Sequence, residues 1–289
     1  MQHNSAVPSV AVIVLTSGGR DTELAEMAAS LAGQVVHERV LVANGVEVEP
    51  IPGWSIVSSP TNLGVPGGRS FGIQHSTSDV LVFLDDDSTA RSADLAARTQ
   101  DLFKNNPALG ALAYRVVVSG SERSLRRWKP AHLRPSGNEP CDAVTFPGNG
   151  HALRRQAFDG VGGYTNEFFF KHEETELSWK LLDAGWNVQY CPDLVVQHPD
   201  TPEGRNPTAV HYAVRNKVWL ARGLLPKGIR GLAIVIATLR VLVRARSSSD
   251  VRQIRAGLAV GFTKSPIDAK PIAWATVREL ARRGRPPLF

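Results

Sequence analysis

An apolar run that ends in three carboxylates constrains the fold of this chain more than any other feature. Residues 80–84 are all aliphatic or aromatic, and Asp85, Asp86 and Asp87 follow at once. Such a run predicts a buried strand. Ligands of open α/β sheets bind at the carboxyl ends of strands, and clustered carboxylates repel one another unless a cation lies among them. The position therefore predicts a site for a cation or a positive edge of a substrate. The alternative is a solvated acidic turn that caps a helix opening near Ser88.

The first hundred or so residues alternate strand and helix patterns, which indicates an α/β fold with a mostly parallel sheet flanked by helices. We expect strands at residues 10–15, 39–43, 54–58, 79–84 and 109–118, and helices at residues 21–32, 65–76 and 93–105. Asp21 is expected to cap the first helix.

The rhythm breaks at residues 119–142, which are rich in Arg, Ser, Pro and Gly and predict a long surface loop or lid. A helix over 174–184, a strand over 187–190 and a helical stretch from Val210 are expected after it. We expect one domain made of two halves, residues 1–118 and 119–200, and a helical basic C-terminal extension over residues 201–289.

Charge separates the extension from the rest of the chain. Residues 201–289 hold 17 Lys and Arg against 4 Asp and Glu, although the whole chain carries only +6. This basic extension predicts an anionic partner. The apolar stretch over residues 229–243 is interrupted by Arg230 and Arg240, and its longest uncharged run, residues 231–239, is too short to span a bilayer. With the arginines around it, residues 229–256 suit an amphipathic helix on an anionic membrane surface, or a helix packed on the sheet with its basic face in water.

The cysteines and the N-terminal residues indicate the cellular compartment in which the protein is expected. Cys141 and Cys191 are far apart and form no Cys-x-x-Cys motif, which argues against a zinc ribbon and fits a reducing cytoplasm. The N-terminus shows no signal-peptide pattern.

Three polar, glycine-containing turns follow the expected strands. They contain Thr16 and Arg20, then Asn44, and then Asn62, Gly67 and Arg69. All can face one crevice at the carboxyl edge of the sheet, where Arg69 and the amides near Gly67 could meet phosphate. The turns match neither Gly-x-Gly-x-x-Gly nor the Walker pattern, so a dinucleotide or P-loop site is not expected.

Three further groups are candidates for chemistry. Glu173 and Glu174 stand where a helix begins, a position that favours an ionised carboxylate and suits either a base or ordinary helix capping. His198 after a strand is a possible metal ligand or a structural histidine. His211 and Arg215 share a helix face and could touch a diphosphate or line a polar surface.

Taken in order, these motifs resemble family 2 glycosyltransferases of the GT-A fold, over about Val10 to Leu225. Within this family, the chain looks most similar to bacterial members that transfer rhamnose or galactofuranose onto cell-envelope glycans. The resemblance rests on Arg20, on Asn62 with Gly67-Gly68-Arg69, on Asp85-Asp86-Asp87, on Gly162-Gly163-Tyr164 leading to Phe168-Phe169-Phe170, and on Glu173-Glu174 leading to Ala184-Gly185-Trp186.

The resemblance implies a metal site and a catalytic base. Asp85, Asp87 and His198 would hold a divalent cation, Mn or Mg. The family's base is the second member of a Glu-Asp pair and falls on Glu174. The chain has Glu-Glu there, so Glu173 is a rival.

The resemblance also implies a nucleotide-sugar donor. Its binding residues would be Thr16, Arg20, Asn44, Asn62, Gly67, Arg69, Asp85, Asp86 and Arg215. Ala43 stands where many relatives have an acidic residue, which leaves UDP- and dTDP-sugars both open. The implied enzyme is inverting and acts in the cytoplasm, or on the inner face of the membrane. Its acceptor is a hydroxyl of a cell-envelope glycan or glycolipid, and no nucleic-acid partner is expected.

Two other functions compete. Asp85-x-Asp87-x-Thr89 also fits the first motif of haloacid dehalogenase-type phosphatases, but no good later acidic motif is found. The second competing function is that of a non-catalytic protein, which would bind an anionic glycan or lipid through the C-terminal extension.

Overall fold

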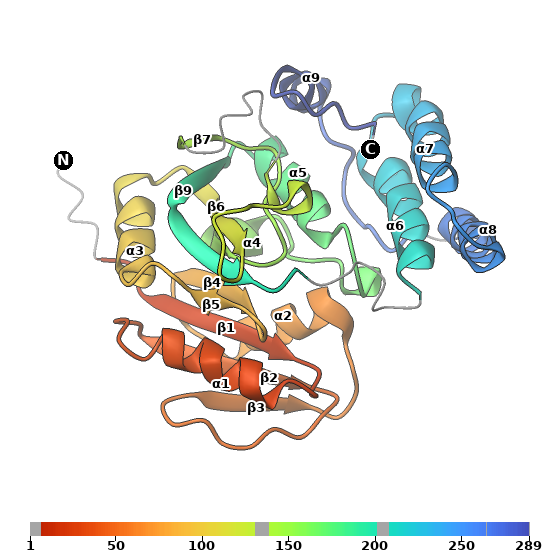
Figure 1. Ribbon diagram of the computed structural model, residues 1–289. Helices are drawn as coiled ribbons and strands as arrows, with labels where there is room; N and C mark the ends of the chain where they lie inside the picture. The colour runs from red at the N-terminus through yellow and green to blue at the C-terminus, as the bar shows by residue number, and fades with distance from the viewer. Residues whose placement is uncertain (1–6, 131–138, 201–207, 264, 289) are drawn as a thin grey trace.

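The computed structural model describes residues 7–130, 139–200, 208–263 and 265–288 and forms one sheet with helices on its faces (Figure 1). The sheet has nine strands among these residues, in the order β3-β2-β1-β4-β8-β6-β9-β5, with β7 paired to β9. The strands are β1 Val10–Thr16, β2 Glu38–Asn44, β3 Ser55–Ser59, β4 Val80–Asp85, β5 Thr89–Ala90, β6 Leu109–Val118, β7 Cys141–Asp142, β8 His151–Arg154 and β9 Asn187–His198.

The helices lie between the strands and after them. They are α1 Asp21–Ser30, α2 Gly64–Gln74, α3 Leu95–Asn105, α4 Arg155–Gly160, α5 Glu173–Asp183, α6 Ala209–Leu224, α7 Lys227–Leu242, α8 Ser248–Thr263 and α9 Trp274–Arg282, with 3₁₀ turns η1 Arg126–Trp128 and η2 Asn166–Phe168. The expected α/β class is confirmed. Asp21 is the first helical residue rather than the cap, because the N-cap position is Arg20.

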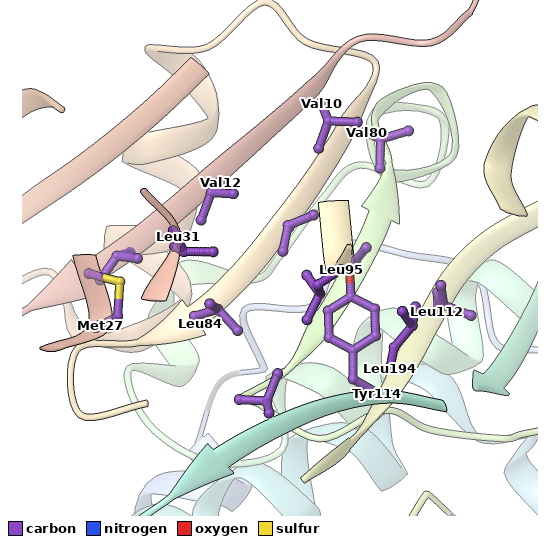
Figure 2. Packing of buried hydrophobic residues seen from close by; sticks show 14 of the residues in the cluster. Val10, Val12, Met27, Leu31, Val80, Leu84, Leu95, Leu112, Tyr114 and Leu194 are labelled. Atoms are coloured by element: carbon purple, nitrogen blue, oxygen red, sulfur yellow. The ribbon is translucent and has the colours of Figure 1, made fainter. Parts of the chain in front are cut away.

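Strands β3, β2, β1 and β4 are parallel, as the apolar runs predict. Alternate residues of β1 and β4 face α1 and α3, where Val12 and Leu84 lie near Met27 and Leu31 (Figure 2). On the other face α2 approaches closely, because a Cβ atom at Gly72 would lie 2.6 Å from Cγ2 of Ile13. The carboxyl ends of these strands are thereby fixed side by side.

The rest of the sheet is more mixed than expected. The short strand β8 pairs antiparallel with both β4 and β6, and β5 and β7 pair antiparallel with β9. The four residues of β8 include His151 and Arg154 and carry no strand pattern. The expected strand at 187–190 is longer, because β9 continues past Pro192 to His198 through a register shift against β6.

The C-terminal extension is helical as expected, and it shares a core with residues 119–200. Trp219 and Leu220 of α6 pack with Phe168 of η2 and Trp179 of α5. The segment over 229–256, expected as one interfacial helix, comprises most of α7, a turn and the first half of α8. The expected loop at 119–142 contains η1 and β7, and residues 131–138 lie outside the described part. Of the helices in the described ranges, none combines the length and apolar character needed to cross a bilayer.

Candidate active site

The aspartate triad lies at the carboxyl edge of the sheet beside the end of β1. Parallel pairing sets Leu15 against Asp85, so Thr16 comes next to Asp86. The Thr16 hydroxyl donates to Asp86 Oδ2 at 2.7 Å, and Arg20 Nη1 lies 2.5 Å from Asp86 Oδ1 and 2.8 Å from Asp87 Oδ2. Burial raises the pKa of Asp86 more than Thr16 and Arg20 lower it. The triad is therefore an acidic site held by two residues of the first turn.

Asp85, Asp87 and His198 converge as a possible metal site. One ligand atom from each lies within 4.8 Å of the others, and His198 Nε2 is 3.2 Å from Asp87 Oδ1. The Nδ1 atom of His198 donates to the Pro199 carbonyl at 2.6 Å, so Nε2 is the atom that faces the carboxylates. Two carboxylates and one imidazole form a donor set that suits Mn²⁺, and their oxygens suit Mg²⁺. The residues present fit a divalent cation.

Arg69 joins this site to the second acidic cluster. It is 5% exposed in α2, and its Nη2 donates to the Gly148 carbonyl at 2.6 Å. Its guanidinium lies 3.7 Å from Asp85, 3.6 Å from Glu173 and 3.5 Å from Glu174. The end of β4 and the start of α5 thus face each other across one cation, and the acidic residues predicted from sequence come together in one site.

The two glutamates differ in their surroundings. The Glu173 side chain is 2% exposed and that of Glu174 is 18% exposed. Burial, followed by the charge of Glu174, raises the pKa of Glu173 well above its ordinary value. A Cβ atom at position 148 would collide with the Glu174 carboxylate, so the glycine there leaves that carboxylate room in its present position. Glu174 is the more accessible of the pair.

Sequence reasoning missed the turn that precedes β8. The Asn149 side-chain oxygen accepts from the Asp85 amide at 3.1 Å, while its Nδ2 is buried without a hydrogen-bond partner among the described residues. His151 is fully buried between Phe83 and Phe146, and burial lowers its pKa well below the ordinary value. The only sequence signal for this turn was the pair of glycines, at 148 and 150, on either side of Asn149.

A strained segment places the start of α5. Phe169, Lys171 and His172 all have positive φ, between 60° and 70°, which side chains other than glycine rarely adopt. The Asn216 amide of α6 holds this segment by donating to the carbonyls of Phe168, Phe170 and Lys171 at 2.7–3.0 Å. Sequence reasoning missed Asn216, because nothing marks one asparagine in a helix.

Arg215 lies beside Asn216 and supports the same segment. Its Nη2 donates to the carbonyls of Glu167 and Phe168, at 2.8 Å each. These contacts give Arg215 a positioning role, and its expected contact with the donor stays a prediction.

The remaining donor candidates make internal contacts. Asn44 Nδ2 donates to Asn62 Oδ1 at 3.0 Å, and Asn62 Oδ1 also accepts the Gly64 amide, which starts α2. Gly67 is buried inside α2, so it is not at a free helix end. These residues shape the turn after β3, and their contact with a donor stays a prediction.

Comparison with known proteins agrees with this geometry. Residues 46–162 match the model of glycosyl transferase family 2. The pre-mycofactocin glycosyltransferase of Mycobacterium tuberculosis is 28% identical over 152 residues, covering 50% of this chain and 32% of that protein. The N-acetylglucosaminyl-diphospho-decaprenol L-rhamnosyltransferase of the same organism is 38% identical over 66 residues, covering 22% of this chain and 21% of that protein. The chain thus spans about a third or less of the length of these relatives.

A solved structure shares the fold along nearly the whole chain. The crystal structure of GalNAc-T7 with UDP, GalNAc and Mn²⁺ aligns with a TM-score of 0.68 at 16% identity, over 96% of this chain and 57% of that one. The fold is that of the GT-A glycosyltransferases. Together with the match of residues 46–162 to the family model, this fold supports a glycosyltransferase of family 2.

Replacing Asn216 with alanine should destabilise the protein by about 2–4 kcal/mol, because the carbonyls of Phe168, Phe170 and Lys171 each lose a hydrogen bond from a buried donor. The matched control is Asn105→Ala at the exposed end of α3, expected within about 0.5 kcal/mol of the parent. Urea unfolding measures both. Equal stability of the two variants would show that Asn216 does not hold the segment.

Proposed function

We propose that the protein is an inverting, metal-dependent transferase that moves a sugar from a UDP- or dTDP-sugar to a hydroxyl of a cell-envelope glycan or glycolipid. One observation carries the proposal. The possible metal ligands Asp85, Asp87 and His198 lie within 4.8 Å of one another, and Arg69 joins Asp85 to Glu174. The candidate cation site and the candidate base thus flank one guanidinium. Displacement at a sugar needs a cation near the leaving group and a base near the acceptor hydroxyl.

Asp85, Asp87 and His198 would hold Mn²⁺ or Mg²⁺. The cation, when bound, neutralises charge that develops on the departing diphosphate. Arg20 keeps Asp86 and Asp87 in place, because it lies within 2.8 Å of both. Thr16 at the end of β1 and Asp86 directly after β4 are our candidates for contact with the nucleoside. The buried Nδ2 of Asn149 is our candidate donor to a hydroxyl of the transferred sugar.

Glu174 would accept the proton of the acceptor hydroxyl. Direct attack on the face opposite the leaving diphosphate inverts the anomeric centre. Burial disfavours ionisation of Glu173, while Glu174 reaches solvent and faces Arg69. Arg69 contacts both Asp85 and Glu174 and so keeps these two carboxylates at a fixed separation. In this role Arg69 does not need to bind a phosphate of the donor.

Binding of nucleotide-sugars tests the proposal directly. We expect heat on titration with a UDP- or dTDP-sugar in the presence of Mn²⁺, little heat in EDTA, and weaker binding to the Asp87→Asn variant. A GDP-sugar serves as the comparison. Absence of metal-dependent binding across this panel would favour the non-catalytic glycan- or lipid-binding alternative.

Replacing Glu174 with glutamine should leave donor affinity intact and lower kcat about 10²- to 10⁴-fold, because the proton acceptor is lost. Glu173→Gln is the matched control. It should keep turnover and raise the midpoint of thermal unfolding, because it removes a buried carboxylate whose ionised form is disfavoured in the fold. Single-turnover assays measure the chemistry. The opposite pattern would transfer the base role to Glu173.

We also propose that α7 rests on an anionic membrane surface. Leu232, Val235, Leu239, Leu242 and Val243 are between 45% and 85% exposed and follow helical spacing along α7. The exposed Arg240, Arg244 and Arg246 stand beside this stripe. An apolar helix face next to cations suits the boundary between acidic headgroups and acyl chains.

Leu239→Asp should abolish most binding of the full chain to phosphatidylcholine vesicles that contain phosphatidylglycerol, because it places a charge in the stripe. The control is Val35→Asp, an exposed apolar residue outside α7. Flotation measures binding, which should also weaken as salt rises. Equal flotation of both variants would exclude α7 as the contact.

A further inference from the structure

A tryptophan from the segment after β6 packs against the imidazole of His198. Trp128 lies in η1 and is 8% exposed, so its indole is nearly enclosed by protein. The ring centroids of Trp128 and His198 are 5.2 Å apart and the ring planes are tilted by 59°, which is direct aromatic contact. Trp128 therefore touches one of the three candidate metal ligands without being a ligand itself.

The other contacts of His198 hold its backbone more firmly than its ring. His198 is the last residue of β9, and its carbonyl accepts from the Ser119 amide at 3.1 Å. Its Nδ1 donates to the carbonyl of Pro199 at 2.6 Å, a partner in the same segment. Its Nε2 lies 3.2 Å from Asp87 Oδ1. Trp128 adds a contact from another segment of the chain, and this contact restricts rotation of the imidazole.

Two ion pairs fix the segment of Trp128 against the end of β9. Arg123 Nη2 lies 2.7 Å from Asp200 Oδ2, and Arg127 Nη2 lies 3.2 Å from Asp200 Oδ1. The Arg127 guanidinium also lies over the indole of Trp128, 4.9 Å from the ring centroid. Each exposed ion pair alone contributes little, but both arginines share one carboxylate two residues after His198. The segment of Trp128 and the end of β9 are thereby joined at several points.

Packing of the hydrophobic core does not explain this position. Trp128 belongs to none of the three apolar clusters formed by the described residues. The ring contacts of its indole are to a histidine and to an arginine. A metal ligand needs such support, because neighbouring side chains must hold its rotamer in the productive geometry.

We propose that Trp128 is a positioning residue of the metal site, which keeps the His198 imidazole turned so that Nε2 faces Asp85 and Asp87. This inference rests on the proposed function for the presence of a divalent cation. A ligand that is already oriented loses less conformational freedom when the ion binds. The indole also covers one side of the imidazole and limits access of water there.

Titration of the full chain with Mn²⁺ alone, followed through the electron paramagnetic resonance signal of the free ion, tests this role. Trp128→Ala should bind Mn²⁺ about 10- to 100-fold more weakly, as expected when a residue that orients a metal ligand is lost. Trp128→Phe keeps an aromatic ring at this position and should recover most of the affinity. The matched control is Trp54→Ala, which removes a half-buried indole packed outside the site and should bind as the parent does. Unchanged affinity in Trp128→Ala, or an equal loss in Trp54→Ala, overturns the proposal.

Tryptophan fluorescence gives a second readout, which general destabilisation would not reproduce. Bound Mn²⁺ should quench part of the emission of the parent, because a paramagnetic ion quenches an indole beside it. This quenched part should disappear in Trp128→Phe although that variant still binds the ion. The same quenched amplitude in Trp128→Phe and in the parent would place Trp128 away from the ion and overturn the proposal.

Asp87→Asn separates failure of this inference from failure of the proposed function. The variant should lose Mn²⁺ binding, because it removes a candidate ligand. If Asp87→Asn loses the ion while Trp128→Ala binds as the parent does, the metal site stands and only the positioning role is overturned. If the parent binds no Mn²⁺, either alone or with UDP, the metal dependence of the proposed function is refuted together with this inference.

Discussion

The site depends on one buried cation that faces three carboxylates. Burial alone would lower the pKa of Arg69, but Tyr164, Glu174, Glu173 and Asp85 raise it, so the guanidinium stays charged. Three carboxyl groups lie within 3.7 Å of that guanidinium, and its charge offsets part of the repulsion among them. Arg69 also donates to the Gly148 carbonyl, and so it fixes the turn before β8 as well. One side chain of α2 thus sets the distance between Asp85 at the end of β4 and Glu174 at the start of α5.

The C-terminal extension is part of this machinery. The three positive-φ residues ahead of α5 cost backbone energy, and such strain persists only where surrounding contacts determine it. Asn216 and Arg215 supply those contacts through five hydrogen bonds to carbonyls of residues 167–171. The orientation of Glu174 therefore depends on a helix that follows the sheet in sequence, and a chain cut at residue 200 would lose it.

The parts of the site that sequence predicts are those with a local chemical signal. The run at 80–84 marks its strand, the consecutive charges of Asp85, Asp86 and Asp87 mark its end, and family spacing points to His198. The roles of Asn149 and Asn216 could not be predicted from the sequence. Each depends on hydrogen bonds of a neutral amide to partners that are 64 residues away for Asn149 and 45–48 residues away for Asn216. The same holds for β8, whose four residues become a strand only because β4 and β6 present unpaired edges to it. Long-range pairing, rather than local propensity, decides these elements.

The uneven charge of the chain follows its division into a sheet and the helices after it. Carboxylates gather at the end of β4 and the start of α5, whereas Lys and Arg outnumber Asp and Glu by 17 to 4 over residues 201–289, where Arg282 and Arg283 pair with Glu279 and Asp142. If these charges served solubility alone, they would be interspersed, as they are on most surfaces. Their separation instead follows the boundary between the sheet and the helices that pack beside it, so the acidic and basic parts of the chain meet where α5 contacts α6.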